Sequence, residues 1–383
     1  MAEAAAVPAP HHAPATTPLD VALALLVAGQ AAVVGLQVVG RHVFRHPVPW
    51  TEEIARLLLV WLMCVGGIRA LQLGEHPRVT ALVRLLSTSR RAAVDRGLRL
   101  VLLVFFVGLV VPAFRLTLSS AAERLPASGI SGAAISAVLP ASLVLMCVVL
   151  ALQIRGEGAA AIRDLAWSLG AAGVAIASVL VPLLAGAEPL VVLVSGFLVT
   201  AALGLPLAFT LALTSATYLL GIGGVSLTIL PIKILGGVDQ FVLLAIPLFI
   251  LAGGLMESGA ISERIVDLAM AIVGRVRGGL AMVVVVAEVL FSGISGSTAA
   301  DVSAISSLLV PSMRRAGYSG GESVSVVAAA SAMGILVPPC LTMVVLGSLV
   351  NLSIVTLFLA GFIPAFLLAA VLLILIAVRA RRR

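Results

Sequence analysis

Charged side chains are scarce in this sequence. Asp, Glu, Lys and Arg together account for 11% of the 383 residues, whereas hydrophobic residues account for 61%, and the mean hydropathy is +1.21. Soluble domains carry about 25% charged and about 45–50% apolar residues. A water-soluble fold would expose a large share of this apolar surface and would aggregate. The composition therefore excludes a soluble globular domain and predicts an integral membrane protein.

Lysine is almost absent as well. Lys233 is the only one, so arginine supplies nearly all of the positive charge behind the net charge of +7. The arginines fall in loops and at the ends of apolar runs, where the positive-inside rule places them. The orientation of the chain in a membrane therefore explains where the arginines lie. We expect no nucleic-acid partner, although the chain is basic.

The patterns that mark zinc and redox sites are also missing. Cys64, Cys147 and Cys340 lie in apolar surroundings and show no CxxC spacing, and the five histidines form no HExxH motif. Isolated cysteines of this kind are typical of small packed hydrophobes. We therefore expect no metal cluster and no bound cofactor.

Apolar stretches of about 20 residues recur along the chain, and this is the length that a helix needs to cross hydrocarbon. Alternation with a period of two, which would mark membrane β-strands, is not found over comparable windows. We therefore predict an all-α, polytopic transmembrane protein. The expected spans are 19–40, 54–73, 98–116, 130–153, 165–185 and 352–378.

The arginine distribution predicts which side of the membrane the loops face. Residues 1–18 are rich in Ala and Pro and are expected to form a disordered cytoplasmic tail. Segment 78–99 is the most basic interior stretch, and two helical hairpins would return the chain to the same side near Arg155 and Arg163. We place these basic segments and both termini in the cytoplasm.

Glycine and proline interrupt the apolar runs after residue 188, which is typical of transporter helices that break at membrane depth. In segment 291–305, Ser292 and Ser295 lie among glycines and Asp301 supplies a carboxylate. A re-entrant hairpin with hydroxyl groups and freed carbonyl oxygens would suit a small cation such as sodium. Close helix packing through small residues is the structural alternative, but a carboxylate within a membrane favours a functional role.

Two further segments belong to the same part of the chain. Segment 332–344 contains paired prolines, which remove backbone donors and leave upstream carbonyl oxygens as a second source of ligands. Segment 257–279 predicts an amphipathic helix at the membrane interface. Its expected apolar face carries Ile261, Ile265, Leu268 and Ile272, and its acidic and basic groups lie on the other side.

Trp50, Thr51, Glu52 and Glu53 allow two interpretations. Thr51 would cap the helix that follows, with both acids at its positive end and Trp50 at the interface. Alternatively, Glu52, Glu53 and Arg56 would contact another subunit. No nucleophile–base pair, Walker loop or GxSxG elbow accompanies these acids, so we expect no enzymatic activity.

Several long motifs together resemble the tripartite ATP-independent periplasmic (TRAP) transporters. Segment 44–79, with four expected spans around it, resembles the small membrane subunit of that family. The stretches that resemble the start of the large membrane subunit are 204–213, 245–269, 278–318 and 334–340. After the tail, the resemblance implies a small-subunit-like four-helix domain at 19–164, a linker helix at 165–187 and a large-subunit repeat at 188–383.

The resemblance also implies a function. TRAP transporters import organic anions such as dicarboxylates and sugar acids across the inner membrane with sodium, and receive them from a periplasmic binding protein. The implied sodium ligands are Ser292, Ser295 and the backbone of Gly334 and Val337. Asp301 would support the hairpin or the substrate path. Cys340 stands where the family usually has a serine, so no hydroxyl ligand is expected there.

A large subunit of this family is expected to contain two inverted repeats that move as an elevator, and 188–383 accommodates one. The second repeat would then be carried by a separate polypeptide, or the chain would be a truncated, non-transporting membrane scaffold or fragment. In both cases we expect this chain alone to insert in a membrane without catalysing uptake.

Overall fold

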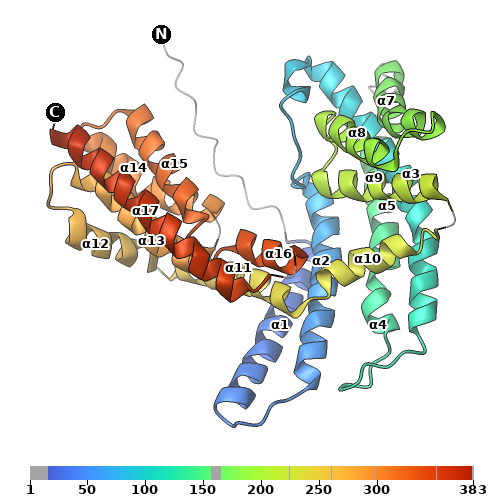
Figure 1. The fold of residues 1–383 in the computed structure, drawn as a ribbon, viewed down its shortest axis with the longest axis horizontal. Coiled ribbons are helices and arrows are strands. Elements are labelled where there is room, and N and C mark those ends of the chain that lie inside the picture. The colour runs from blue at the N-terminus through green and yellow to red at the C-terminus, as the bar shows by residue number, and fades with distance from the viewer. Residues whose placement is uncertain are drawn as a thin grey trace. The chain divides into compact units, whose positions relative to one another are not determined.

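A computed structural model describes residues 16–156, 165–223, 225–259, 261–296, 298–350 and 352–381. Its regular structure is helical, and the described ranges contain isolated β-bridges but no β-strand. This confirms the predicted all-α class. The chain forms two compact units, Met1–Asp239 and Gln240–Arg383, which can be followed by colour in Figure 1. The division falls inside the large-subunit-like segment 188–383 and not at its start.

The first unit is built from long apolar helices joined by short loops. Its helices are α1 (Pro18–His42), α2 (Trp50–Leu73), the 3-10 turn η1 (Val83–Leu85), α3 (Thr88–Ser120), α4 (Ala133–Ser136), α5 (Val138–Gly156), α7 (Leu165–Leu184), α8 (Pro189–Ala202), α9 (Leu207–Ile222) and α10 (Ile229–Val238). The second unit consists of the 3-10 turn η2 (Phe241–Leu244), α11 (Ala245–Ser258), α12 (Ile261–Val273), α13 (Gly279–Ser295), α14 (Thr298–Arg315), α15 (Gly320–Gly334), α16 (Leu341–Val350) and α17 (Ile354–Arg381).

Six helical segments of the described chain are long and apolar enough to cross a membrane. They are α1, α2, α3, α4 together with α5, α7 and α17, and each coincides with a predicted span. Helix α3 begins at Thr88, ten residues before the expected start. Hydropathy marks only the part of a helix that can lie in hydrocarbon, whereas arginine is a good helix former and continues the helix beyond it. Half of the basic segment 78–99 is therefore helix and not loop.

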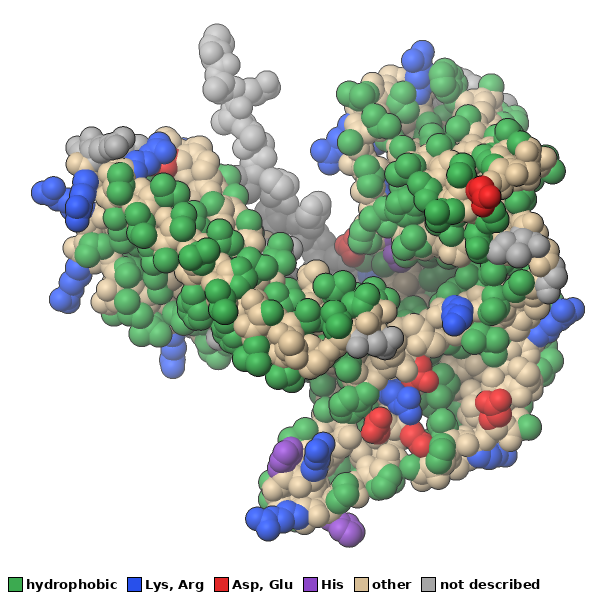
Figure 2. Space-filling view, in the orientation of Figure 1, with side chains coloured by type: hydrophobic (Ala, Val, Ile, Leu, Met, Phe, Trp, Pro, Cys, Tyr) green, Lys and Arg blue, Asp and Glu red, His purple; other side chains and the backbone are tan. Residues whose placement is uncertain are grey.

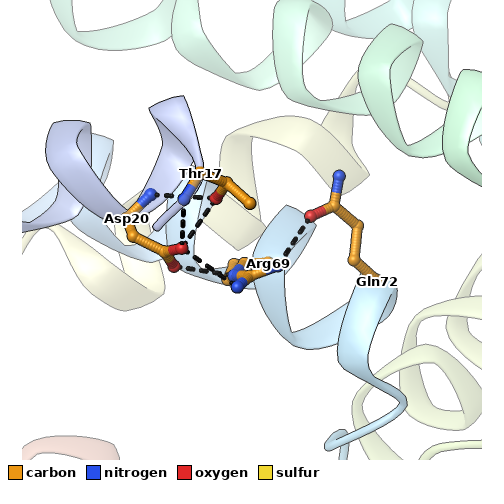
Figure 3. Close-up of polar contacts among 4 residues, drawn as sticks. All are labelled: Thr17, Asp20, Arg69 and Gln72. Carbon is orange, nitrogen blue, oxygen red and sulfur yellow. Dashed lines mark hydrogen bonds and ion pairs between the residues drawn. The ribbon is translucent and has the colours of Figure 1, made fainter. Parts of the chain in front are cut away.

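The start of α1 is fixed to the end of α2 by an ion pair. Thr17 caps α1 in a reciprocal capping box with Asp20, so the predicted disorder of residues 1–18 is wrong for Thr17 and Pro18; residues 1–15 lie outside the described ranges. Arg69 donates from Nε and Nη2 to the two carboxylate oxygens of Asp20, at 2.7 and 3.0 Å, and Figure 3 shows this fork with Gln72 beside it. The bidentate geometry fixes the register of the first hairpin.

Thr51 does not cap α2, contrary to one prediction. The N-cap residue is Pro49, which has no side chain that could accept a hydrogen bond, and the Thr51 hydroxyl donates to the Val48 carbonyl oxygen. The helix begins two residues earlier than a cap at Thr51 would place it, because Pro49 already has helical φ and ψ angles. The first-turn position of Glu52 and Glu53 is confirmed.

Glu53 holds the loop that follows α3. Its carboxylate accepts hydrogen bonds from the backbone amides of Ala127 and Ser128, at 2.9 and 2.8 Å, and from the Ser128 hydroxyl. The start of α2 and the end of α3 therefore lie at the same end of the first unit. At the opposite end of α3, Arg90 lies over the Trp167 ring at 4.9 Å. This arrangement is the one that two successive hairpins produce.

The loop after α2 packs on the turn before α9. The Leu207 amide donates to the Pro77 carbonyl oxygen at 2.9 Å, and the rings of His76 and Phe209 meet edge to face at 4.6 Å. Burial in this contact lowers the pKa of His76 below its usual value, so the imidazole is neutral and packs as an aromatic group. These contacts join the small-subunit-like helices to the first helices after residue 188.

The amphipathic helix predicted within 257–279 is present as α12. The residues that it buries within the unit are Ser262, Ile265, Val266 and Ala269. Of the apolar residues predicted for one face, Ile265 is therefore packed inside, whereas Leu268 and Ile272 are more than half exposed. Hydrophobic side chains also cover most of the visible surface in Figure 2, as lipid contact requires.

Candidate functional site

The candidate site lies in the second unit, where two helices form a hairpin. Helix α13 ends at Ser295, and Gly296 follows with a left-handed φ of +63° before α14 begins at Thr298. A left-handed residue ends a helix cheaply only if it is glycine. The predicted re-entrant hairpin is thus two short helices, and α13, with 17 residues, is too short to span about 30 Å of hydrocarbon at about 1.5 Å per residue.

Ser292 lies on the inner side of this hairpin. Its side chain is 2% exposed, and its hydroxyl donates to Oδ2 of Asp301 at 3.1 Å. Asp301 belongs to the first turn of α14 and is fully buried. The hydroxyl and the carboxylate therefore connect the two arms of the hairpin across its tip. The backbone of Ser295 is helical, but its side chain lies outside what is described, and so does residue 297.

The second broken segment follows α15. Helix α15 ends at Gly334, and α16 begins at Leu341, after the proline pair. Among the described residues, no backbone amide hydrogen-bonds to the carbonyl oxygens of Val337, Pro338 or Pro339. The segment is nevertheless packed inside the unit, since Val337 and Cys340 are 6% and 3% exposed. It therefore supplies carbonyl oxygens that accept no backbone hydrogen bond in the described region, as the proline pair predicts.

The hairpin and the second break are in contact. A Cβ atom built on Gly334 would overlap the Ser292 hydroxyl and lie 3.4 Å from Oε1 of Glu288. A Cβ atom on Gly296 would lie 3.2 Å from the Pro339 carbonyl oxygen. The two segments approach so closely because both contact positions are glycines. The structure therefore brings Ser292 and Asp301 of the hairpin close to Gly334 and Val337 of the second break, although about forty residues separate the two segments in the sequence.

The oxygen atoms at this contact suit a hard cation. They comprise a hydroxyl, carbonyl groups and carboxylates. Hard ions such as sodium prefer oxygen ligands of this kind, and interrupted membrane helices are where transporters place them. The residues present fit the predicted sodium site.

The residues around Trp50 belong to the first unit. Arg56 Nη1 lies 3.5 Å from Oδ1 of Asp239, the residue that follows α10. Arg56 thus links a small-subunit-like helix to the large-subunit-like part of the chain, although both partners remain about a third exposed. Glu52 and Trp50 are exposed. Exposed ion pairs contribute little to stability, so Arg56 and Asp239 mainly indicate which surfaces meet.

Sequence reasoning missed Glu288 and Ser331. Glu288 is fully buried in α13 one turn before Ser292, and Ser331 is 3% exposed in α15 one turn before Gly334. The signal for Glu288 was present, because a single acid stands in the long apolar run of α13, and such an acid marks a functional site by default. Ser331 carried no signal, since serine is common between packed membrane helices.

The comparisons with known proteins were consistent with one family. Residues 30–157 match "Tripartite ATP-independent periplasmic transporters, DctQ component", and residues 194–383 match "Tripartite ATP-independent periplasmic transporter, DctM component". The sialic acid TRAP transporter permease protein SiaT of Haemophilus influenzae is 29% identical over 352 residues, which is 88% of this chain and 57% of SiaT.

Two further relatives match less than half of this chain. The 2,3-diketo-L-gulonate TRAP transporter large permease protein YiaN of Escherichia coli is 38% identical over 45% of this chain and 41% of its own length. The C4-dicarboxylate TRAP transporter large permease protein DctM of Pseudomonas aeruginosa is 38% identical over 45% of this chain and 40% of its own length. The chain thus spans about half the length of the curated relatives it matches.

Proposed function

This chain belongs to the TRAP transporters, with DctQ and DctM regions in one polypeptide, and from this premise we propose that it is the membrane part of a sodium-coupled importer of organic anions. The chain is a polytopic helical membrane protein and not an enzyme. Its relatives are named for sialic acid, 2,3-diketo-L-gulonate and C4-dicarboxylates, which are all anions. We infer that the cargo is a carboxylate of this class, delivered by a periplasmic binding protein at the inner membrane.

The contact between Ser292 and Gly334 is the observation that supports sodium coupling. It places a buried hydroxyl against the end of a broken helix, in a region where each polar group must find a partner. In this proposal Ser292 and Ser295 offer hydroxyl ligands, and Gly334 and Val337 offer carbonyl oxygens. Asp301 holds the Ser292 hydroxyl in place. Bound sodium would supply the counter-charge and the coupling to the sodium gradient.

Removal of either hairpin hydroxyl should raise the sodium requirement of uptake. Ser292→Ala and Ser295→Ala each delete one neutral oxygen with little change in volume. In cells that carry the complete transporter, we expect half-maximal uptake to need about tenfold more sodium, the effect of about 1.4 kcal/mol. Uptake of a labelled dicarboxylate or sialic acid is measured against sodium concentration, with choline replacing sodium.

Ser307→Ala is the matched control for these variants, because Ser307 donates within its own helix to the Ala304 carbonyl oxygen. It should leave the sodium dependence unchanged. If Ser292→Ala and Ser295→Ala, expressed at normal levels, both keep the parent sodium curve, the site assignment is wrong.

We further propose that the basic segment 78–99 and both termini face the cytoplasm, and that 188–383 works with a second repeat carried elsewhere. The chain divides functionally into 19–164, 165–187 and 188–383 in this proposal. The contacts of α3 are compatible with this orientation, because the loop after its C-terminal end contacts Glu53 at the start of α2, whereas Arg90 near its N-terminal end lies over Trp167 at the start of α7. The arginine excess then assigns the basic end to the cytoplasm.

A pair of cysteine variants tests this orientation. Ser89 is exposed within the basic segment, and Ala122 is exposed in the loop after α3. In intact spheroplasts, a membrane-impermeant maleimide should label Ala122→Cys and should not label Ser89→Cys until the membrane is permeabilised. The parent chain gives the background, since Cys64 and Cys340 are buried and Cys147 is half-buried. The reverse labelling pattern would invert the topology.

A further inference from the structure

Glu288 is a buried carboxylate for which the proposed sodium site gives no role. It is 0% exposed, and neither Oε1 nor Oε2 accepts a hydrogen bond from the described residues. Its neighbours along α13 are apolar, including Val283, Val284 and Val285, which are fully buried or nearly so. An ionised carboxylate in such surroundings is very unfavourable without a positive partner. The Glu288 carboxylate therefore requires a positively charged partner that the described side chains do not supply.

Helix geometry directs Glu288 to the same place as Ser292. The two residues are four apart on α13 and so share one face of that helix. On the facing helix α15, Gly334 meets both of them, with Oε1 of Glu288 3.4 Å from the position of a Gly334 Cβ atom. Ser331 precedes Gly334 by three residues, and its hydroxyl faces the Glu288 carboxylate without closing a hydrogen bond. Three oxygen-bearing side chains thus converge.

The charges around Glu288 are negative. Asp301 on α14 is the charged group that acts on it, and no cationic side chain of the described region does so. On α12, Glu263, Arg264 and Asp267 are exposed. On α17, Arg379 is exposed and lies 3.5 Å from Glu322. The packed elements of the described region therefore place no positive side chain against the Glu288 carboxylate.

We propose that Glu288 is an anionic ligand of the cation site, and that sodium binds between the Glu288 carboxylate and the hydroxyl groups of Ser292 and Ser331. This proposal rests on the proposed sodium coupling and adds a charged ligand to it. One cation satisfies both Glu288 oxygens and the Ser331 hydroxyl together, whereas a proton satisfies a single oxygen. A cavity of about 360 Å³ between α14 and α15 is lined in part by Ser331.

Binding of radioactive sodium to the purified whole chain tests the proposal. Glu288→Gln keeps the size of the side chain and removes its charge. We expect the Kd for sodium to rise about tenfold or more, Glu288→Asp to recover part of the affinity, and Ser331→Ala to raise the Kd severalfold. Glu263→Gln is the matched control, because Glu263 is an exposed acid of the neighbouring helix α12.

Thermal unfolding provides a second measurement. Sodium chloride should raise the unfolding temperature of the parent chain relative to choline chloride, as a ligand of the folded state does. Glu288→Gln should lose most of this sodium-dependent increase and unfold no earlier than the parent chain in choline chloride, since it removes a buried charge. If Glu288→Gln does not fold, Ser331→Ala decides by the same two measurements.

The outcomes separate the two proposals. The role of Glu288 is overturned if Glu288→Gln binds sodium as tightly as the parent chain while Ser292→Ala loses binding. Where Glu288→Gln does not fold, the same result for Ser331→Ala overturns it. The proposed function remains intact in both cases. If the parent chain binds no sodium, both proposals fail. A raised Kd in Glu288→Gln and Ser331→Ala with an unchanged Kd in Glu263→Gln supports the charged site.

Discussion

Replacing Gly334 with alanine is expected to weaken sodium binding by about tenfold or more, equivalent to about 1.4 kcal/mol per factor of ten. The added Cβ atom would overlap the Ser292 hydroxyl, which lies directly against the backbone of α15. The hydroxyl can rotate away, but it then loses its hydrogen bond to Asp301 and leaves the contact with the broken segment. The measurement is equilibrium binding of radioactive sodium to the purified chain.

Gly254→Ala is the matched control for Gly334→Ala. Gly254 lies in α11 of the same unit, and a Cβ atom there would meet nothing within 4 Å. This variant should bind sodium normally and be slightly more stable, because alanine is the better helix former by about 1 kcal/mol. The assignment is contradicted if Gly334→Ala folds and binds sodium as tightly as the parent chain does.

Replacing Gly97 with alanine should destabilise the first unit by about 1–3 kcal/mol, as overpacking does. A Cβ atom on Gly97 would overlap the Ser168 carbonyl oxygen and lie 3.2 Å from the Cβ atom of Ala171. The obstacle is helix backbone, so it cannot rotate away, and α7 would have to move off α3. The buried Arg96, which donates to the Ser168 hydroxyl at 3.3 Å, would lose that contact.

Thermal unfolding of the purified chain measures this effect. Gly97→Ala should lower the midpoint by several degrees, whereas Gly108→Ala in the same helix should not, since a Cβ atom at Gly108 would meet nothing within 4 Å. Equal midpoints for the two variants would contradict the close packing of α7 on α3, and with it the placement of the linker helix.

The sequence predicted the long helices well, because hydrophobic length is a strong signal. Helices α1, α7 and α17 begin and end within three residues of the expected spans. Caps were predicted less well. Thr51 is a residue type that commonly caps helices, yet Pro49 precedes it with helical angles. The sequence also did not show which residues of α12 are buried, because that depends on how α12 packs against α13. Such details depend on neighbours that are remote in the sequence.

The site was predicted only in part, because its contacts also depend on residues that are remote in the sequence. The glycines and serines of the hairpin and the proline pair indicated where helices break and singled out Ser292, whereas Gly334 was named only because the resemblance to the family implied it. That Ser292 bonds to Asp301, and that Glu288 and Ser331 face the same point, depends on the packing of α13 against α14 and α15. A single sequence shows which residues are unusual, but not which of them meet.

The most direct test of the account is to locate the cation. Crystals of this chain soaked in a thallium(I) salt, a heavy monovalent substitute for alkali cations, would show the bound ion by anomalous scattering. We predict a peak in contact with the Ser292 hydroxyl, the carbonyl oxygens at Gly334 and Val337, and the Glu288 carboxylate, and we predict that excess sodium displaces it. A sodium-sensitive peak elsewhere in the chain, or no peak at saturating thallium, would contradict the central claim.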